Sequence, residues 1–162
     1  PETYRTGTVL GANGFDLAEY YHSHGLRAYA GTAHPRLPNR WEIVGPLGFV
    51  GFAWMDYVET VAAHAVRLIA AARGRADAPV VAVRNDAFHK WNALMDRRGR
   101  TAHTYYTRKS ALRTYFVNSQ HETPYYRPQT ITGARIFAKR SPLTDYEFST
   151  VQAATMSEEL SA

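Results

Sequence analysis

The side chains in this sequence that are best suited to chemistry are its seven histidines and eleven tyrosines. An imidazole can exchange a proton near neutral pH and can bind a metal ion, and a phenol both donates and accepts hydrogen bonds. Together these groups are typical of a polar pocket with aromatic walls. The sequence therefore predicts a small-molecule site, and the fold must bring a subset of these residues together to form it.

The segment 118–128 is dense in such groups and is too rich in proline for a helix. Functional loops often have this composition. We expect His121 to act as an acid–base group and Tyr126 to be a second catalytic residue. Arg127 is suited to hold a carboxylate through two parallel hydrogen bonds, and Tyr125 to line the pocket beside it. The alternative is an exposed turn whose tyrosines pack on a sheet.

The composition limits the classes of protein to be considered. With 162 residues, 45% hydrophobic and 20% charged, the chain is expected to fold as one globular domain. The absence of cysteine excludes disulfides, zinc knuckles, iron–sulfur clusters and cysteine nucleophiles. No stretch is long and apolar enough to predict a membrane span. The lack of cysteine makes a cytoplasmic protein the simplest expectation. The net charge of +5 raises the question of nucleic acid or of an anionic substrate.

Helices and strands alternate along the chain in the predicted secondary structure. The segment 57–73 is the best helix, because its apolar residues recur at three- and four-residue steps, and His64 is expected to face solvent on another side of it. Further helices are predicted at 15–24, 86–97 and 108–118, the second of them ended by Gly99. Strands are predicted at 6–12, 26–31, 41–44, 49–55, 79–83, 101–107, 131–139 and 145–151.

This alternation predicts an α+β fold. A shift of 69 positions lays segment 8–34 on segment 77–103, strand on strand and helix on helix. We therefore expect a single domain, 1–162, made of two paired βαβββ modules at about 5–75 and 77–152, with an extra amphipathic helix. The tail 153–162 is expected to be frayed.

The run from His103 to Phe116 places a histidine early on a predicted strand, followed by a turn and a helix that carries an aromatic pair. With Glu147 on the last predicted strand, it resembles a module of the vicinal oxygen chelate superfamily. The size and two-module outline are similar to those of the small single-domain extradiol dioxygenases, which open L-DOPA in the biosynthesis of lincomycin and pyrrolobenzodiazepines. The resemblance implies Fe(II), O2 and cleavage of a catechol ring beside a hydroxyl.

The same resemblance implies a set of metal ligands. Fe(II) that activates oxygen suits two neutral imidazoles and one carboxylate on one face. His103 and Glu147 supply two of these, and His34 is our choice for the third because the shift of 69 makes it equivalent to His103; His89 is the alternative. His121 would then take a phenolic proton from the catechol, and Arg127, Tyr125 and Tyr105 would bind the substrate.

Two further functions are open. A metal-free protein of the same fold that sequesters an antibiotic is favoured because the first predicted strand has no histidine. A basic nucleic-acid-binding domain is favoured by the arginines and tyrosines of 97–115. The principal expectation remains a catechol and O2 as partners, without nucleic acid or membrane, in a homodimer.

Overall fold

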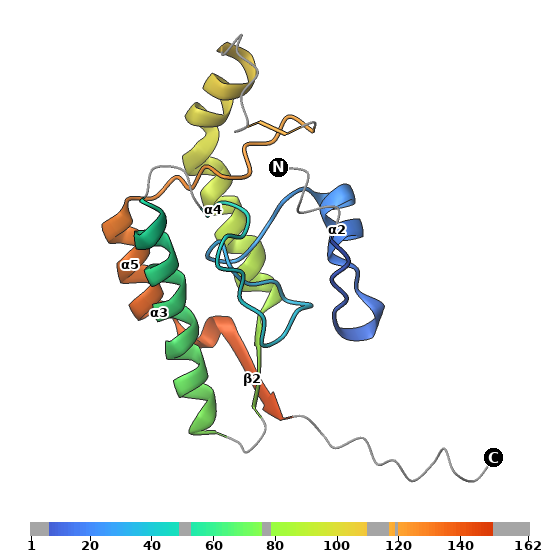
Figure 1. Ribbon diagram of the computed structural model, residues 1–162, viewed down its shortest axis with the longest axis vertical. Helices are drawn as coiled ribbons and strands as arrows, with labels where there is room; N and C mark the ends of the chain where they lie inside the picture. The colour runs from blue at the N-terminus through green and yellow to red at the C-terminus, as the bar shows by residue number, and fades with distance from the viewer. Residues whose placement is uncertain (1–6, 49–52, 76–78, 110–116, 119, 151–162) are drawn as a thin grey trace, which may run out of the picture.

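The structure is a computed structural model that describes residues 7–48, 53–75, 79–109, 117–118 and 120–150. In this part of the chain it contains four α-helices and a two-stranded sheet (Figure 1). The helices are α2 (Leu17–His24), α3 (Trp54–Arg73), α4 (Asn85–Thr104) and α5 (Ile131–Arg140), and the strands are β1 (Pro79–Val83) and β2 (Tyr146–Thr150). Short 3-10 turns lie at Ala12–Gly14 and Leu143–Asp145, and a π-turn at Tyr105–Lys109 continues α4.

Helix α4 runs through the middle of the molecule (Figure 1). Helices α3 and α5 pack against each other on one side of it, and α2 lies on the other side. The sheet lies at the end of the molecule where α4 begins. Within the described residues, none of the helices combines the length and the apolar character that crossing a membrane requires.

Strands β1 and β2 pair in antiparallel register, with Pro79 opposite Thr150 and Val83 opposite Tyr146. The β-branched valines of β1 favour a strand, and Val81 and Val83 point into the core. The predicted strand 79–83 is confirmed, and the predicted strand 145–151 is confirmed over 146–150, because Asp145 belongs to the preceding 3-10 turn.

The two helices with the clearest sequence signals are also confirmed. Helix α2 begins at Leu17 because the Asp16 carboxylate accepts hydrogen bonds from the backbone N–H groups of Ala18 and Glu19, at 2.7 and 3.2 Å. Helix α3 begins at Trp54, three residues before the predicted start, and ends at Arg73 as predicted. The expectation that His64 faces solvent is wrong, because this side chain is only 2% exposed.

Helix α5 occupies the segment 131–140, where the sequence pattern predicted a strand. Two features make it a helix. The Thr130 hydroxyl accepts a hydrogen bond from the Gly133 N–H at 3.1 Å and so caps the first turn. Ala134 and Ala138, four residues apart, are both buried, and α5 packs against α3. Small residues at this spacing let two helices approach closely.

Helix α4 extends to Thr104 and then continues as the π-turn, so the strand predicted at 101–107 is wrong. Gly99 does not end the helix as expected. It lies buried inside α4, where a side-chain methyl group added to it would stand 3.5 Å from the Pro128 ring. Packing against this segment therefore keeps the helix intact despite the low helix propensity of glycine.

Three other predicted strands are not strands within the described residues. Segments 7–12 and 26–31 contribute only the single bridge pairs Leu10–Asp16 and Tyr29–Ala33, and 41–44 is a loop. Of the predicted strand 49–55, residues 49–52 lie outside the described residues and Trp54 begins α3. Most of the predicted helix 108–118 and the tail 153–162 also lie outside them. The paired βαβββ arrangement stays a prediction.

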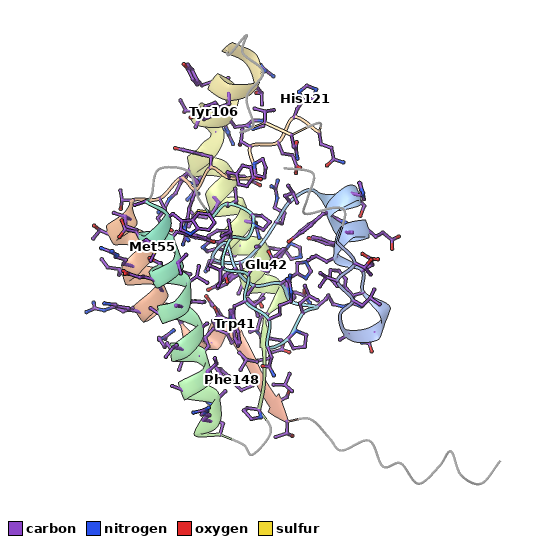
Figure 2. All side chains as sticks on the ribbon, in the orientation of Figure 1. Trp41, Glu42, Met55, Tyr106, His121 and Phe148 are labelled. Carbon is purple, nitrogen blue, oxygen red and sulfur yellow. The ribbon has the colours of Figure 1, made fainter. Side chains whose placement is uncertain are left out.

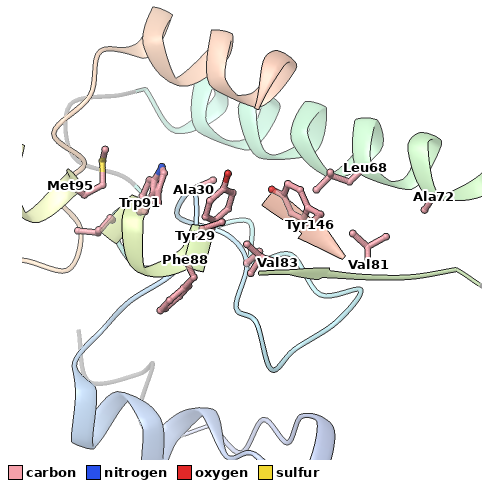
Figure 3. Close-up of a cluster of buried hydrophobic side chains, with 13 residues drawn as sticks. Tyr29, Ala30, Leu68, Ala72, Val81, Val83, Phe88, Trp91, Met95 and Tyr146 are labelled. Atoms are coloured by element: carbon pink, nitrogen blue, oxygen red, sulfur yellow. The ribbon is translucent and has the colours of Figure 1, made fainter. Parts of the chain in front are cut away.

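The main hydrophobic core lies between α3, the sheet and the first half of α4 (Figure 3). Helix α3 contributes Leu68 and Ala72, and β1 contributes two valines. Aromatic rings fill the rest of this core, and they are Tyr29, Phe88, Trp91 and Tyr146. A smaller cluster holds α2 against the neighbouring loops through Leu17, Tyr21, Leu26 and Leu37. Helix α4 is thus anchored along one side, and its other surfaces remain available to form pockets.

Candidate functional site

A cleft of about 320 Å³ lies beside the C-terminal half of α4. One wall is the helix itself, through Met95, Gly99 and His103. The irregular segment 122–128 forms the facing wall, and Leu26 and Leu47 close the base. Leu47 is held to this segment by a hydrogen bond from its N–H to the Pro124 carbonyl. The cleft therefore combines apolar walls with a polar rim, as small-molecule sites commonly do.

The rim of the cleft carries charged groups of both signs. Arg27 and Asp96 form an ion pair at 3.5 Å, and Arg100 is an exposed cation one turn further along α4. His103 Nδ1 lies 3.4 Å from the Thr123 hydroxyl, a long contact that holds the imidazole at the rim. The cleft thus has the hydrogen-bond donors Arg100 and His103 beside its apolar lining.

Glu122 fixes the segment opposite α4 to the rest of the chain. One carboxylate oxygen accepts a hydrogen bond from the Leu26 N–H at 3.0 Å, and the other accepts from the Asn118 side-chain amide at 2.6 Å. Gly25, with φ +80°, leaves room for this carboxylate, because a methyl group there would overlap it. The far wall of the cleft is therefore held by specific polar contacts.

Neighbouring residues of the segment face opposite directions. Tyr126 and Pro128 line the cleft, whereas Arg127 points into the interior and is 3% exposed. Arg127 donates to the Ala30 carbonyl at 3.1 Å and to Gln129 Oε1 at 3.0 Å. Burial lowers the pKa of Arg127 to about 10, so the guanidinium remains charged at neutral pH. The structure thus places Arg127 away from the pocket that Tyr126 lines.

Two hydrogen bonds between polar side chains lie in the main core. Tyr29 donates a hydrogen bond to Asp145 at 2.5 Å, and His64 Nε2 lies 2.5 Å from the Tyr146 hydroxyl. Burial raises the pKa of Tyr29 and of Tyr146 above the usual phenol value. Burial also lowers the pKa of His64 to about 4, with Arg67 acting in the same direction. His64 is therefore a neutral core residue at pH 7.

The three predicted iron ligands are not brought together. His34 is buried between the rings of Phe15, at 4.7 Å, and Phe88, at 5.0 Å, and burial lowers its pKa to about 4. His103 lies in the last turn of α4. Glu147 is exposed on β2, opposite the β1 residue Ala82 that precedes α4, and it faces Arg84 at 3.7 Å.

A helix of 20 residues is about 30 Å long, so His103 and Glu147 lie near opposite ends of α4. Figure 2 shows His121, two residues before the Thr123 that contacts His103, near one end of the molecule, and Phe148, the neighbour of Glu147, toward the other. His89, the alternative ligand, is exposed on α4 next to Phe88. Among the described residues, no three His, Asp or Glu side chains are grouped to hold a metal ion. The predicted Fe(II) site is wrong.

The other predicted site residues occupy the end of the molecule beyond the cleft. Tyr105 is exposed in the π-turn, with its ring 5.5 Å from that of Tyr106. Tyr106 in turn lies 6.5 Å from the ring of Tyr126. Tyr125 is partly buried, which raises its pKa, and His121 is exposed in a turn with φ 59°. Of this group, Tyr126 lines the cleft, and the roles assigned to the others stay predictions.

Sequence reasoning did not identify the α4 residues Met95, Gly99 and Arg100 as part of a site, although all three line the cleft from one side of that helix. It also missed the burial of His64, although a signal was present. Residues Tyr57, Val61, His64, Leu68 and Ala72 of α3 are spaced by four, three, four and four positions, and all five are buried. The spacing placed His64 on the buried stripe despite its polarity.

Comparison with known proteins identifies the fold through solved structures. No protein-family model and no curated protein matches the sequence. The crystal structure of cyclohexanone monooxygenase from Rhodococcus sp. Phi1 bound to NADP+ superposes on 91% of this chain and 28% of its own length, with a TM-score of 0.70 and 16% identity. Oxidized steroid monooxygenase bound to NADP matches 87% of this chain and 26% of its own, with a TM-score of 0.62 and 18% identity.

Polycyclic ketone monooxygenase from the fungus Thermothelomyces thermophila is also similar, with a TM-score of 0.54, 16% identity, and coverage of 88% of this chain and 24% of that one. The chain therefore shares its fold with about a quarter of the length of these enzymes.

These neighbours correct the family expectation. They are flavin-dependent Baeyer–Villiger monooxygenases, whose fold differs from that of the vicinal oxygen chelate superfamily. The expected extradiol dioxygenase function and Fe(II) cofactor are therefore wrong. The physical reason lies in the run 103–116, where His103 is on a helix and a π-turn follows, so the strand and turn that carried the resemblance are absent from its described part.

Proposed function

We propose that this chain is part of an oxygenase of the ketone monooxygenase kind, and that the cleft beside α4 binds a small cyclic ketone. The observation that carries the proposal is the shared fold over 91% of the chain with cyclohexanone monooxygenase, which has been solved with NADP+ and with cyclohexanone. The chain spans about a quarter of that enzyme, so the complete reaction would require further protein.

The lining of the cleft supports a ketone as ligand. Pro128 and the ring of Tyr126 offer an accessible apolar surface that suits a saturated ring, and the buried Met95, Leu26 and Leu47 lie behind it. A ketone carbonyl only accepts hydrogen bonds, and the imidazole of His103 and the phenol of Tyr126 are potential donors on the same cleft. The volume of about 320 Å³ is at the lower end for ligand pockets and fits one or two rings.

The cofactors of such enzymes, NADP and a flavin, do not fit the cleft beside α4. A dinucleotide is much larger than the cleft. The glycines at 45 and 48 do not form an open phosphate cradle, because the chain itself fills the space. A methyl group on Gly45 would lie 2.5 Å from the Gly31 carbonyl oxygen, and one on Gly48 would lie 2.7 Å from the Gly45 carbonyl oxygen. We therefore assign this chain a share in binding the ketone and no step of the redox chemistry.

Gly99 provides a sharp test of this assignment. It is buried in the cleft wall, and a methyl group there would make an ordinary contact of 3.5 Å with Pro128. Gly99→Leu is expected to fill the cleft, whereas Gly99→Ala is a matched control that adds one methyl group to the helix. Titration with cyclohexanone, followed by amide chemical shifts in NMR spectra, is expected to perturb residues 99–103 and 122–126.

We expect Gly99→Leu to weaken cyclohexanone binding by at least about tenfold, the effect of losing roughly 1.4 kcal/mol. Gly99→Ala should weaken it much less. Wild-type spectra that do not change with cyclohexanone would overturn the proposal, and so would shifts that persist in Gly99→Leu.

A further inference from the structure

A second hollow, of about 520 Å³, lies on a different side of α4 from the cleft. We call it the aromatic groove and define it by the rings of Tyr29, Trp91 and Phe137, the side chain of Leu94, and the cations Lys90 and Arg97. Residues 87, 90, 91, 94 and 97 recur at three- and four-residue steps along α4, so they form one continuous stripe of the helix. The cleft uses residues 95, 96, 99, 100 and 103 instead.

The floor of the groove is rigid and aromatic. The rings of Tyr29 and Trp91 have centroids 6.0 Å apart, and those of Tyr29 and Phe137 are 5.8 Å apart. Tyr29 and Trp91 are 1% and 5% exposed, so each presents only a small part of its ring to the groove. Tyr29 is further fixed by its hydrogen bond to Asp145. The packed rings therefore form a fixed base, and the apolar surface that a flat ligand can contact comes chiefly from the half-buried Phe137 and Leu94.

The charge at the rim is positive on the side of α4. Lys90 and Arg97 are exposed and lie seven residues, or about 10 Å, apart along the helix, on the same side of it. Among the described residues, neither has a carboxylate within ion-pair distance, whereas Arg27, Arg84 and Arg135 all do. Asp145 at the opposite rim is engaged by the Tyr29 hydroxyl. An acidic group on a ligand is therefore attracted to Lys90 and Arg97 on the α4 rim and is repelled by Asp145 on the opposite rim.

We propose that the aromatic groove binds a flat aromatic carboxylate, with its rings against Phe137 and Leu94 and its carboxylate on Arg97. Arg97 is the expected partner because a guanidinium holds a carboxylate through two parallel hydrogen bonds, whereas the ammonium of Lys90 adds a less directional attraction. The two hollows thus differ in ligand chemistry: a neutral carbonyl compound for the cleft and an acid for the groove. This site is independent of the proposed ketone function.

The test uses naphthoate as the probe and naphthalenemethanol as its uncharged counterpart, with binding measured by calorimetry and by amide chemical shifts. Naphthoate is expected to bind saturably and to shift residues 90–97 and 137. Naphthalenemethanol should bind about tenfold more weakly, because it lacks the charge-assisted hydrogen bonds. The affinity for naphthoate should fall as salt is added, since Arg97 is exposed.

Three variants test which side chains bind naphthoate. Arg97→Gln should weaken naphthoate about tenfold and leave naphthalenemethanol unchanged. Arg100→Gln, an exposed arginine on the cleft side of the same helix, is the matched control and should change neither. Ala93→Trp, at an exposed position on the groove, should block both compounds without entering the core.

The absence of saturable naphthoate binding would overturn the proposal. Equal affinities for the acid and the alcohol would also overturn it, as would a larger effect of Arg100→Gln than of Arg97→Gln. Failure of the ketone proposal leaves these outcomes unaffected, because Gly99→Leu fills only the cleft.

Discussion

The cleft and the aromatic groove lie on two sides of one helix, but their walls are built differently. The groove is floored by Tyr29 and Trp91, which belong to the main core of the molecule. The cleft has α4 on one side and, on the other, the irregular segment 122–128, held by the hydrogen bonds of Glu122. Changes in the floor of the groove should therefore lower the free energy of unfolding, whereas changes in the cleft should mainly alter ligand binding.

Acidification is expected to have the largest effect on the free energy of unfolding, because it protonates buried histidines. The pKa of both His34 and His64 is lowered to about 4, chiefly by burial, with the neighbouring Arg36, Arg40 and His89 acting on His34, and Arg67 and Arg127 on His64. The unfolded chain takes up these protons below about pH 6.5, but the folded chain does so only near pH 4. The free energy of unfolding should therefore fall as the pH is lowered through this range.

A pKa difference of this size corresponds to about 3 kcal/mol for each imidazole. Urea unfolding at pH 7.5 and at pH 4.5 measures the change. His64→Gln should show a smaller loss between the two values than the wild type, because one of the two buried imidazoles is gone. An equal loss in the variant and the wild type would show that other groups cause the acid dependence.

Removal of the groove floor should have the next largest effect. Trp91→Ala is expected to lower the free energy of unfolding by about 3–5 kcal/mol, the range for deleting a large buried aromatic side chain. Trp54→Ala is the matched control, since Trp54 is 51% exposed, and its effect should be below about 1 kcal/mol. Urea unfolding curves compare the two variants. Similar losses in both would contradict the distinction between core and surface tryptophans.

These two predictions also show what the sequence could and could not establish. Strand β1 and helix α3 were predictable because a compact β-branched run and a repeating apolar stripe each indicate structure locally. Helix α5 was not, because its β-branched and aromatic residues, Ile131, Thr132, Ile136 and Phe137, also suit a strand. Packing of its buried alanines against α3 decided the outcome, and this information lies more than fifty residues away in the chain.

The candidate site was harder to predict than the elements. Tyr126 lines the cleft, while its predicted catalytic role stays a prediction, and the next residue, Arg127, lies on the other side of the segment. Composition shows that a segment is rich in functional groups, and it does not show which side each group faces. His103 and Glu147 illustrate a related error: their pairing depended on both residues lying on strands, and one of them lies on a helix.

The cleft wall should tolerate a small change that the core would not. Gly99→Ala is expected to raise the free energy of unfolding by up to about 1 kcal/mol, because alanine is the better helix former and its methyl group finds an ordinary contact. Thermal or urea unfolding measures the gain. A loss of more than 1 kcal/mol would mean that the cleft wall is as tightly packed as the core, and that the cleft and the groove floor do not differ in their contribution to stability.

The smallest effect is expected at Glu147, which belongs to neither hollow. Its side chain is 64% exposed, and its carboxylate faces Arg84 at 3.7 Å. Glu147→Gln should change the free energy of unfolding by less than about 1 kcal/mol, as is usual for an exposed ion pair. Urea unfolding at low and high salt measures it, and a larger change would indicate a structural role that the geometry does not predict.

The hydrogen bonds that position residues 26–29 have a consequence for how this chain acquires its structure. The Leu26 N–H bonds to a carboxylate 96 positions later, and Tyr29 bonds to one 116 positions later. Contacts between such distant positions form late, because a long loop must close before they are gained. During synthesis, residues 26–29 therefore cannot form these hydrogen bonds until Glu122 and Asp145 have been made. Shortened products that lack Asp145 should be readily degraded by proteases.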